Sequence, residues 1–176
     1  MAYCAACDGM FYKNKTVAVV GGGNSAAADA LLLSKICKKV ILINRRDKLR
    51  ASKIYQEQLF NRENIEFCWN MEVNKLLGEN RLSSVQLREV NTDEVSIINV
   101  DGLFVSIGQS PATELFSQSI ELDKQGYIVA NETTKTNIDG VFAAGDVRTK
   151  PLRQIITAAS DGAVAAYYAE EYLLEI

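Results

Sequence analysis

Cys4 and Cys7 are the pair of side chains in this sequence best suited to redox chemistry. Two residues separate them, and at this spacing two thiols can close a small, reactive disulfide, because each thiolate is a good leaving group for the other. The chain contains no histidine, which excludes Ser-His and Cys-His nucleophilic mechanisms. In a reducing compartment, such a pair is more often catalytic than structural.

A glycine-rich loop lies a short distance along the chain. It comes directly after the apolar, β-branched run of residues 16 to 20 and directly before the alanine- and leucine-rich run of residues 24 to 34. This strand–loop–helix order is the context that a dinucleotide fingerprint requires. Six residues are therefore candidates for nucleotide binding: Gly21, Gly22, Gly23, Asn24, Ser25 and Ala26.

The residue types at several positions of this loop suit nucleotide binding for physical reasons. Gly21 permits a tight turn, Gly23 lets a pyrophosphate approach the backbone, and Ala26 lets the helix pack close to the strand. The free N–H groups and the dipole at the helix N-terminus favour phosphate. Asn24 and Ser25 can add side-chain hydrogen bonds. A glycine-rich turn that binds nothing is the alternative interpretation, and the strand–loop–helix context argues against it.

Arginines after the second predicted strand, residues 39 to 43, indicate which dinucleotide binds. An NAD site has Asp or Glu here to hold the ribose hydroxyls, whereas this chain has Arg45, Arg46 and Arg50. Guanidinium groups bind a 2′-phosphate through charge-assisted hydrogen bonds, and an acid would repel it. We therefore expect NADPH rather than NADH, and a solvated basic patch is the alternative.

The remaining pattern predicts an α/β fold with a β-α-β unit and an inserted antiparallel meander. Residues 51 to 62 have helical character, with Ile54, Tyr55 and Leu59 as the expected apolar contacts. Strands are expected over residues 65–69 and 102–107, and the meander over 73–77, 85–90 and 95–100. A break at residues 108 to 111 is followed by two expected short strands, 126–129 and 141–144, and a helix over 153–174.

Composition narrows the classes of function. The net charge of −3 gives no reason to expect nucleic acid or anionic membranes as partners. No apolar run approaches the length of a membrane span, and the N-terminal residues show no secretory signal, so a cytoplasmic location is expected. Only Cys4 and Cys7 have metal-ligand spacing, which disfavours zinc. Cys37 and Cys68 are expected to pack in the core.

Several stretches of this sequence resemble a known family. The stretches C-A-A-C-D-G, G-G-G-N-S-A and N-R-R-D-K-L-R are similar to those of the low-molecular-weight bacterial thioredoxin reductases. The likeness continues through residues 102 to 108, Pro111, residues 140 to 147 and the pair Arg153-Gln154. It therefore spans nearly the whole chain, in order.

The resemblance implies a mechanism in which electrons pass from NADPH through FAD to the Cys4–Cys7 disulfide and on to thioredoxin. By this carry-over, Cys7 faces the flavin, Cys4 attacks the substrate disulfide, and Asp8 moves the proton, a role that suits a chain without histidine. The three arginines match the family's 2′-phosphate cluster. Asn44 stands where the family usually has histidine. Asparagine can still donate a hydrogen bond to the 2′-phosphate, and we expect a weaker preference for NADPH.

The resemblance also divides the chain into residues 1–108, an NADPH-binding domain with the redox pair, and residues 109–176, the C-terminal portion of an FAD-binding domain. Its cofactor contacts are expected at seven further residues: Ile107, Gly108, Gly145, Asp146, Arg153, Gln154 and Ile155. The family's first FAD segment has no counterpart before Cys4. We therefore expect a fragment that binds NADPH, has an incomplete FAD site and little reductase activity, and comes from a parent that is a homodimer.

Two other functions remain open. One is the flavoprotein of an alkyl hydroperoxide reductase system, which has a further N-terminal thioredoxin-like extension. The other is a non-catalytic NADP-binding or interaction module. Alkylation of Cys4 and Cys7 discriminates the module from a reductase, because only a redox pair cycles between disulfide and dithiol.

Overall fold

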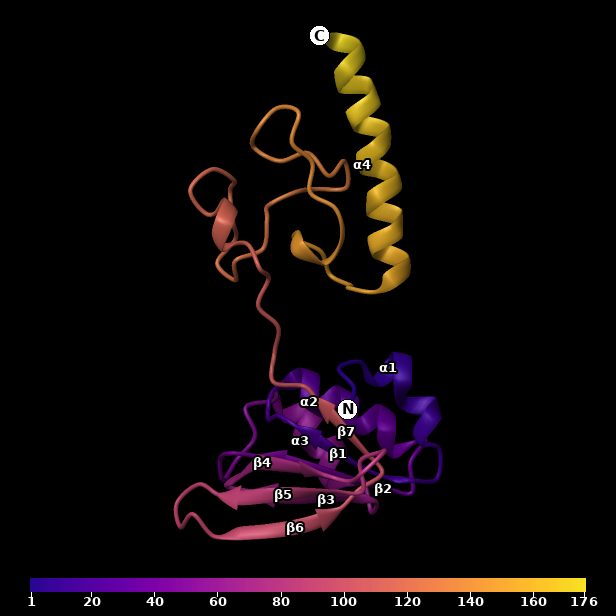
Figure 1. Cartoon of the computed structure of the whole chain (residues 1–176), viewed down its shortest axis with the longest axis vertical. Coiled ribbons are helices and arrows are strands. Elements are labelled where there is room, and N and C mark those ends of the chain that lie inside the picture. The colour runs from indigo at the N-terminus through magenta and orange to yellow at the C-terminus, as the bar shows by residue number, and fades with distance from the viewer. The chain divides into compact units, whose positions relative to one another are not determined.

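The structure is a computed structural model that describes all 176 residues, and the chain divides into two compact units. Unit 1 is Met1–Gly108 and unit 2 is Gln109–Ile176. Unit 1 contains every strand of the structure, and unit 2 contains the longest helix (Figure 1).

A four-stranded parallel sheet forms the centre of unit 1. Its strands are β1 (Thr16–Val20), β2 (Lys39–Asn44), β3 (Ile65–Trp69) and β7 (Gly102–Val105), and their order is β3-β2-β1-β7. Strands β2 and β3 lie on one side of β1, and β7 lies on its other side, so the strand order switches at β1. In open parallel sheets, ligands bind at such a switch point, beyond the carboxyl ends of the strands.

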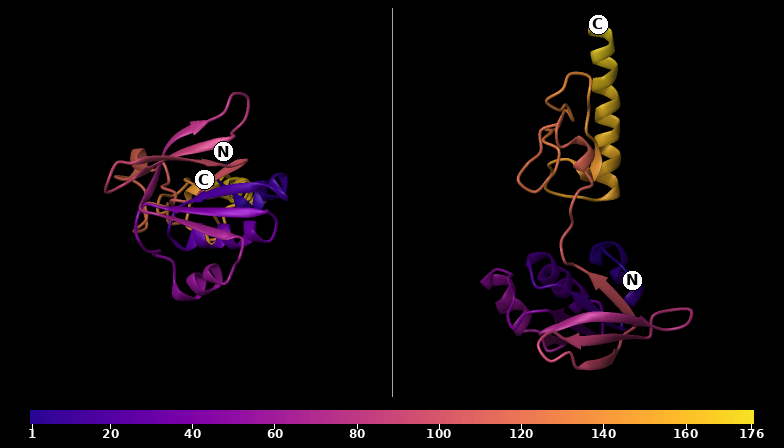
Figure 2. Two further views of the ribbon diagram at one scale, coloured as in Figure 1. Left: turned by 90° about the horizontal axis from the view of Figure 1, so that it is seen from below. Right: turned by 60° about the vertical axis from the view of Figure 1, so that its left-hand side comes forward.

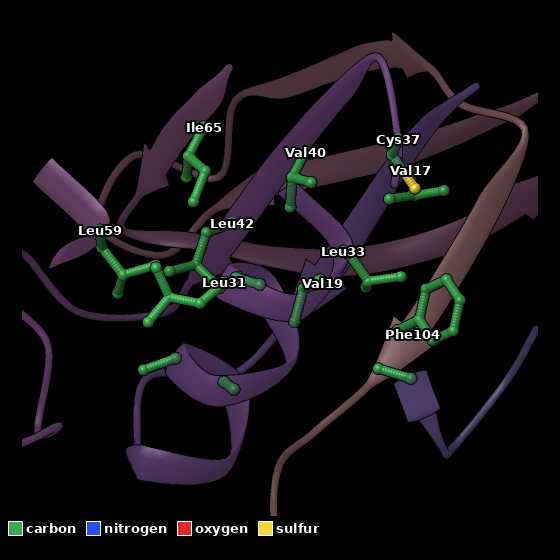
Figure 3. Packing of buried hydrophobic residues seen from close by; sticks show 14 of the residues in the cluster. Val17, Val19, Leu31, Leu33, Cys37, Val40, Leu42, Leu59, Ile65 and Phe104 are labelled. Carbon is green, nitrogen blue, oxygen red and sulfur yellow. The ribbon is translucent and has the colours of Figure 1, made fainter. Parts of the chain in front are cut away.

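Helices cover one face of this sheet. They are α1 (Ala5–Asp8), the 3₁₀ turn η1 (Gly9–Tyr12), α2 (Asn24–Ser34) and α3 (Lys53–Phe60). The strand residues that alternate toward this face pack with Leu31 and Leu33 of α2 and Leu59 of α3 (Figure 3). Ile54, which the sequence placed among the apolar contacts of α3, is exposed instead, because only one narrow side of this short helix meets the sheet.

A three-stranded antiparallel meander covers the opposite face. It consists of β4 (Met71–Leu77), β5 (Ser84–Glu89) and β6 (Val95–Asn99), in that order. Val85 and Leu87 of β5 are fully buried against Ala18, Ile41 and Ile43 of the parallel sheet. Figure 2 shows the helices and the meander on opposite sides of the parallel strands. The predicted α/β fold with an antiparallel insert is therefore confirmed.

Unit 2 has little regular structure before α4 (Ile155–Glu175), with only the 3₁₀ turns η2 (Glu114–Phe116) and η3 (Gly145–Val147). The short strands expected at residues 126–129 and 141–144 are wrong. Ile128 makes single bridges to Leu122 and Arg148, and Phe142 makes one to Lys135, so no ladder of hydrogen bonds develops. None of the helices is both long enough and apolar enough to cross a membrane.

Candidate functional site

A cavity of about 540 Å³ opens at the switch point of the parallel sheet. It lies beyond the carboxyl ends of β1, β2 and β7 and is walled by the loops that follow these strands. Its lining comprises Val20, Gly21, Gly22, Gly23, Ser25, Ile43, Asn44, Arg45, Arg46, Arg50, Met71, Glu72, Val73, Ser106, Ile107 and Gly108. The position and volume suit a mononucleotide or dinucleotide.

The three glycines of the loop have different structural roles. Gly21 has a φ of 145°, and a Cβ there would lie 2.4 Å from the carbonyl oxygen of Ser106. A Cβ on Gly22 would lie 2.5 Å from the amide oxygen of Asn44, whereas a Cβ on Gly23 would meet nothing within 4 Å. Gly21 and Gly22 are therefore required by packing, and Gly23 leaves its backbone open to the cavity.

The other loop residues divide between binding and packing. Ser25 lines the cavity at the N-terminus of α2, where the helix dipole favours phosphate. Ala26 is fully buried and packs close to Gly21, as the fingerprint requires. The Asn24 side chain, expected to add a hydrogen bond to a ligand, instead accepts one from the backbone N–H of Ser52. It therefore ties the loop to the start of α3.

Asn44 also positions other residues rather than offering a donor to a ligand. Its buried amide nitrogen donates to the carbonyl oxygens of Arg46, at 3.1 Å, and Lys48, at 2.9 Å. The expectation that Asn44 keeps a hydrogen bond for the 2′-phosphate does not fit this geometry, because both N–H groups already have acceptors. Asn44 instead fixes the turn that carries Arg45 and Arg46.

The three arginines meet at the cavity wall although Arg50 is several residues away from the other two in sequence. The backbone N–H of Arg50 donates to the carbonyl oxygen of Gly22, at 2.6 Å, which brings Arg50 beside the glycine loop. Arg45, Arg46 and Arg50 are exposed and have no ion-pair partner in the structure. Three uncompensated guanidinium groups on one wall form a ready site for a dianionic phosphate.

Part of the cavity wall comes from the meander, which sequence reasoning missed. Residues 71 to 73 begin β4 directly after β3, and the backbone N–H of Asn70 donates to the carbonyl oxygen of Arg46. Glu72 is the only acidic residue in the lining. No short motif marks these residues, because their place depends on the insertion point of the meander.

The end of β7 forms the opposite wall. The predicted strand over residues 102 to 107 stops at Val105, so Ser106, Ile107 and Gly108 leave the sheet and line the cavity. The Ser106 hydroxyl donates to the carboxylate of Asp29 on α2, at 2.5 Å. Burial raises the pKa of Asp29, and the Ser106 hydrogen bond partly offsets that rise. The bond ties the Ser106 wall to α2.

Cys4 and Cys7 form a disulfide at the start of α1. Ala2 pairs in parallel with Phe104, donating to Leu103 and accepting from Val105, so the N-terminal segment runs along β7. Cys4 follows two residues later and thus lies toward the carboxyl-terminal edge of the sheet, where the cavity opens. Asp8 is half-buried at the end of α1, and its backbone N–H donates to the carbonyl oxygen of Cys4.

The surroundings of the disulfide are exposed and apolar. Cys7 is exposed and Cys4 half-buried, while Tyr3, Met10 and Phe11 are each more than 60% exposed. By contrast, burial raises the pKa of the Cys37 and Cys68 thiols, which lowers their thiolate fraction. Only the Cys4–Cys7 pair therefore combines access with redox chemistry.

In unit 2, three of the expected cofactor residues come together at the N-terminus of α4. Arg153 donates to the carbonyl oxygen of Asp146 and stacks on the ring of Tyr127, 3.8 Å from its centroid. Gln154 caps the helix reciprocally with Thr157. The neighbouring Ile155 is 90% exposed, so the helix begins with an apolar side chain in the open.

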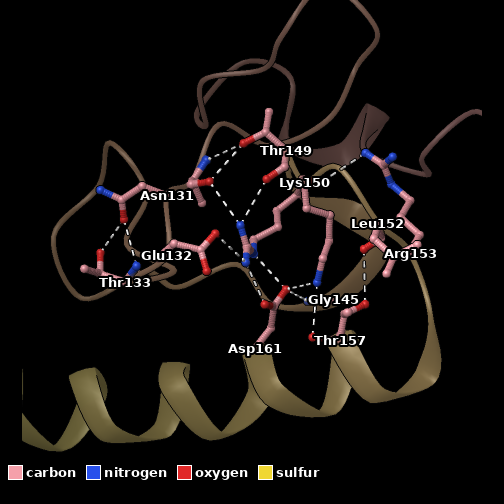
Figure 4. Close-up of polar contacts among 12 residues, drawn as sticks. Asn131, Glu132, Thr133, Gly145, Thr149, Lys150, Leu152, Arg153, Thr157 and Asp161 are labelled. Atoms are coloured by element: carbon pink, nitrogen blue, oxygen red, sulfur yellow. Dashed lines mark hydrogen bonds and ion pairs between the residues drawn. The ribbon is translucent and has the colours of Figure 1, made fainter.

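A buried ionic cluster, which we name the Asp161 cluster, joins α4 to the preceding loops (Figure 4). The Asp161 carboxylate accepts from Arg148, at 2.6 and 2.7 Å, from Lys150, at 2.7 Å, and from the backbone N–H of Gly145, at 2.9 Å. Chiefly through Arg148, these bonds hold the pKa of the Asp161 carboxyl well below its usual range. In the sequence, Asp161 is only the single aspartate of an alanine-rich helical stretch.

Comparison with known proteins agrees with this architecture. The sequence profile of the family described as "Pyridine nucleotide-disulphide oxidoreductase" matches residues 1–162. The chain is 44% identical to the thioredoxin reductase of Listeria innocua, over all of this chain and 56% of that protein. It is 46% identical to the thioredoxin reductase of Streptomyces clavuligerus, over 98% of this chain and 54% of that protein.

A solved structure gives the same result in three dimensions. The crystal structure of thioredoxin reductase from Streptococcus pyogenes superposes with a TM-score of 0.93 and 39% sequence identity, covering 99% of this chain and 57% of that one. The chain therefore spans about half the length of the relatives it matches. With the profile matching most of its length, this chain belongs to the pyridine nucleotide-disulphide oxidoreductase family.

Proposed function

We propose that this chain carries the NADPH-binding and disulfide-exchange parts of a thioredoxin reductase. The single observation that carries the proposal is that one sheet edge holds both the glycine–arginine cavity and the segment leading to the Cys4–Cys7 disulfide. The relatives named above, which are called thioredoxin reductases, support the assignment.

The cavity residues bind and orient the dinucleotide in this proposal. The open backbone at Gly23 and the N-terminus of α2, with Ser25, receive the pyrophosphate. Arg45, Arg46 and Arg50 receive the 2′-phosphate, which distinguishes NADPH from NADH. The nicotinamide end of the dinucleotide lies toward β7, against the opposite wall that contains Ile107 and Gly108.

The residues proposed for the flavin lie in unit 2. Asp146 and Arg153 are held together at the start of α4, and the N-terminal dipole of that helix favours an electron-rich ring. When bound, NADPH supplies a hydride equivalent and FAD passes two electrons to a disulfide. Gly145, Gln154 and Ile155 complete the proposed contacts.

The cysteines then exchange electrons with a protein disulfide. The Cys4 thiolate attacks one sulfur of the thioredoxin disulfide and forms a mixed disulfide, and Cys7 then displaces the reduced partner as the Cys4–Cys7 bond reforms. Two electrons leave the chain, and the partner gains two thiols. The half-buried carboxyl of Asp8 is the proposed proton carrier. A cytoplasmic location and a homodimeric assembly complete the proposal.

Single-turnover exchange tests this function with the residues at hand. The chain is reduced with dithiothreitol, desalted without oxygen and mixed with one equivalent of oxidised bacterial thioredoxin. Alkylation and mass analysis then count the thiols of each protein. We expect thiols to pass from Cys4 and Cys7 to thioredoxin, and we expect Cys7→Ser to trap a mixed disulfide that Cys4→Ser does not trap.

Two results would contradict the proposal. Thiols that stay on the chain would show that the pair is not an exchange dithiol for this partner. Trapping by Cys4→Ser instead of Cys7→Ser would reverse the roles of the two sulfurs. Cys68→Ser is the matched control, because it removes a half-buried thiol without touching the disulfide.

A further inference from the structure

We propose that Asp29 is a positioning residue for the nicotinamide half of the dinucleotide, and that it acts by holding Ser106 at the end of β7. This inference rests on the proposed NADPH site and assigns a task to one wall of that cavity. The Ser106 wall consists of Ser106, Ile107 and Gly108, which line the cavity. Asp29 is outside the lining and contacts this wall through the Ser106 hydroxyl.

The strand order places the two halves of a dinucleotide on opposite sides of β1. Arg45 and Arg46 follow β2, on one side of β1, and the Ser106 wall follows β7, on the other side. The glycine loop follows β1 itself and lies between them. A dinucleotide crosses a sheet at such a switch point. With its 2′-phosphate at the arginines and its pyrophosphate at the glycine loop, its nicotinamide half therefore meets the Ser106 wall.

Ser106 is the last residue of this wall that hydrogen bonds attach to the rest of unit 1. Its backbone N–H donates to the carbonyl oxygen of Val20 at 2.9 Å, and its hydroxyl donates to the Asp29 carboxylate at 2.5 Å. Ile107 and Gly108 neither donate nor accept a hydrogen bond, and Ile107 is 68% exposed. The position of these two residues against a ligand therefore depends on how firmly Ser106 is held.

The helix α2 makes Asp29 a firm attachment point. Asp29 lies on α2 between Ala26 and Ala30, which are both fully buried, so the helix cannot shift without disturbing the core. The N-terminus of the same helix is the proposed pyrophosphate site, and Asp29 comes only about one and a half turns later. One rigid element thus sets the spacing between the pyrophosphate site and the Ser106 wall.

The Asp29 carboxylate is placed here at a cost to folding. Burial raises its pKa, and the Ser106 hydrogen bond offsets only part of that rise. No lysine or arginine forms an ion pair with it. An ionisable group held in this state beside a ligand cavity is typical of a functional site. A carboxylate only accepts hydrogen bonds, so it also fixes the direction in which the Ser106 hydroxyl points.

Isothermal titration of four proteins with two ligands tests this role. The proteins are the wild type, Asp29→Ala, Ser106→Ala and the double variant. The ligands are NADPH and 2′,5′-ADP, which keeps the adenosine half with its 2′-phosphate and lacks the nicotinamide half. The two single variants break the same bond from opposite sides, so Ser106→Ala carries the test if Asp29→Ala folds poorly in a urea-unfolding check. Glu57→Ala is the matched control, because Glu57 is an exposed helical acid of unit 1 outside the cavity lining.

We expect each single variant to weaken NADPH binding by about threefold to tenfold, the effect of one lost hydrogen bond, and to leave the Kd of 2′,5′-ADP unchanged. Removing the Asp29 charge by itself would favour both anionic ligands, so weaker NADPH binding identifies the hydrogen bond as the cause. The double variant should bind NADPH as the single variants do, because all three lack the same bond. Glu57→Ala should bind both ligands as the wild type does.

The outcomes separate this inference from the proposed function. If the single variants weaken NADPH and 2′,5′-ADP equally, or leave both unchanged, Asp29 does not position the nicotinamide half, and the inference is overturned while the nucleotide site stands. Additive losses in the double variant would also overturn it, because Asp29 and Ser106 would then act separately. If the wild type binds neither ligand, the proposed site is overturned, and the inference with it.

Discussion

The Asp161 cluster offers the sharpest test of how unit 2 holds its shape. Asp161→Asn keeps the size of the side chain but removes the charge that Arg148 and Lys150 share. The side chains of both cations are no more than 5% exposed, so neither charge can be solvated unless its side chain leaves the buried site. The apolar core of the unit centres on Ile128, Ala130 and Ala143, which is too small to hold α4 against the loops by itself.

The structure sets the magnitude of this effect. Breaking a buried ion pair by removing one partner costs about 3–5 kcal/mol. A small cavity of about 180 Å³ adjoins the cluster and can admit water. We therefore expect the lower end, about 3 kcal/mol, or more than about a hundredfold in the opening equilibrium of the segment from 145 to 161.

Hydrogen exchange read by mass spectrometry measures this opening directly. Peptides from residues 145 to 161 should exchange faster in Asp161→Asn, and peptides from β1 and β2 should not change. Asp139→Asn is the control, because Asp139 is an exposed acid of the same unit. Equal exchange in Asp161→Asn and the wild type would refute the argument that the cluster fixes α4.

The same cluster predicts a pH dependence with a definite sign. The folded pKa of Asp161 lies below its ordinary value of 3.8, so its contribution to stability is fully present above pH 3.8. It is lost as the pH falls from 3.8 toward the lower folded pKa. The difference in exchange between the wild type and Asp161→Asn should therefore shrink in acid. A difference that grows in acid would contradict the assigned direction.

Three further predictions concern the nucleotide cavity. Gly21→Ala should lower the free energy of unfolding in urea by at least about 2 kcal/mol, because Gly21 has a positive φ and the Ser106 oxygen lies close. Gly23→Ala should fold normally and bind NADPH about tenfold more weakly. Asn44→Ala should cost about 1–3 kcal/mol, because it removes both side-chain hydrogen bonds and leaves the Lys48 carbonyl oxygen without its donor. Titration should show NADPH binding weakened more than NADH binding. Asp29→Asn should be at least as stable as the wild type in urea at neutral pH, and the difference should vanish in acid. The pKa of Asp29 is raised in the folded state, so ionisation of this carboxyl opposes folding as the pH rises through its folded pKa.

Local patterns were enough to predict the central sheet and the glycine loop. Continuous β-branched runs predicted β1 and β2, and the glycines between a strand and a helix predicted the loop that lines the cavity. The predicted bounds of α2, residues 24 to 34, agree with the structure, because the helix starts directly after the glycine loop and Lys35 is its C-cap. These features depend on neighbours in sequence.

Features that depend on distant contacts were missed. Glu72 reaches the cavity only because the meander starts where β3 ends, and Asp29 meets Ser106 across most of unit 1. Ala2 extends the edge of β7 through a bridge that no short motif predicts. In unit 2, runs of apolar residues predicted strands, but positive φ angles at Gly126 and Gly140 keep the chain in turns.

The central claim is that the cavity of unit 1 binds a 2′-phosphorylated nucleotide, and amide chemical-shift mapping with 2′,5′-ADP tests it most directly. The account predicts saturable shifts at residues 21–25, 44–50, 71–73 and 106–108, with 5′-ADP giving weaker binding to the same residues. Shifts confined to other residues, or equal binding of the two nucleotides, would contradict it.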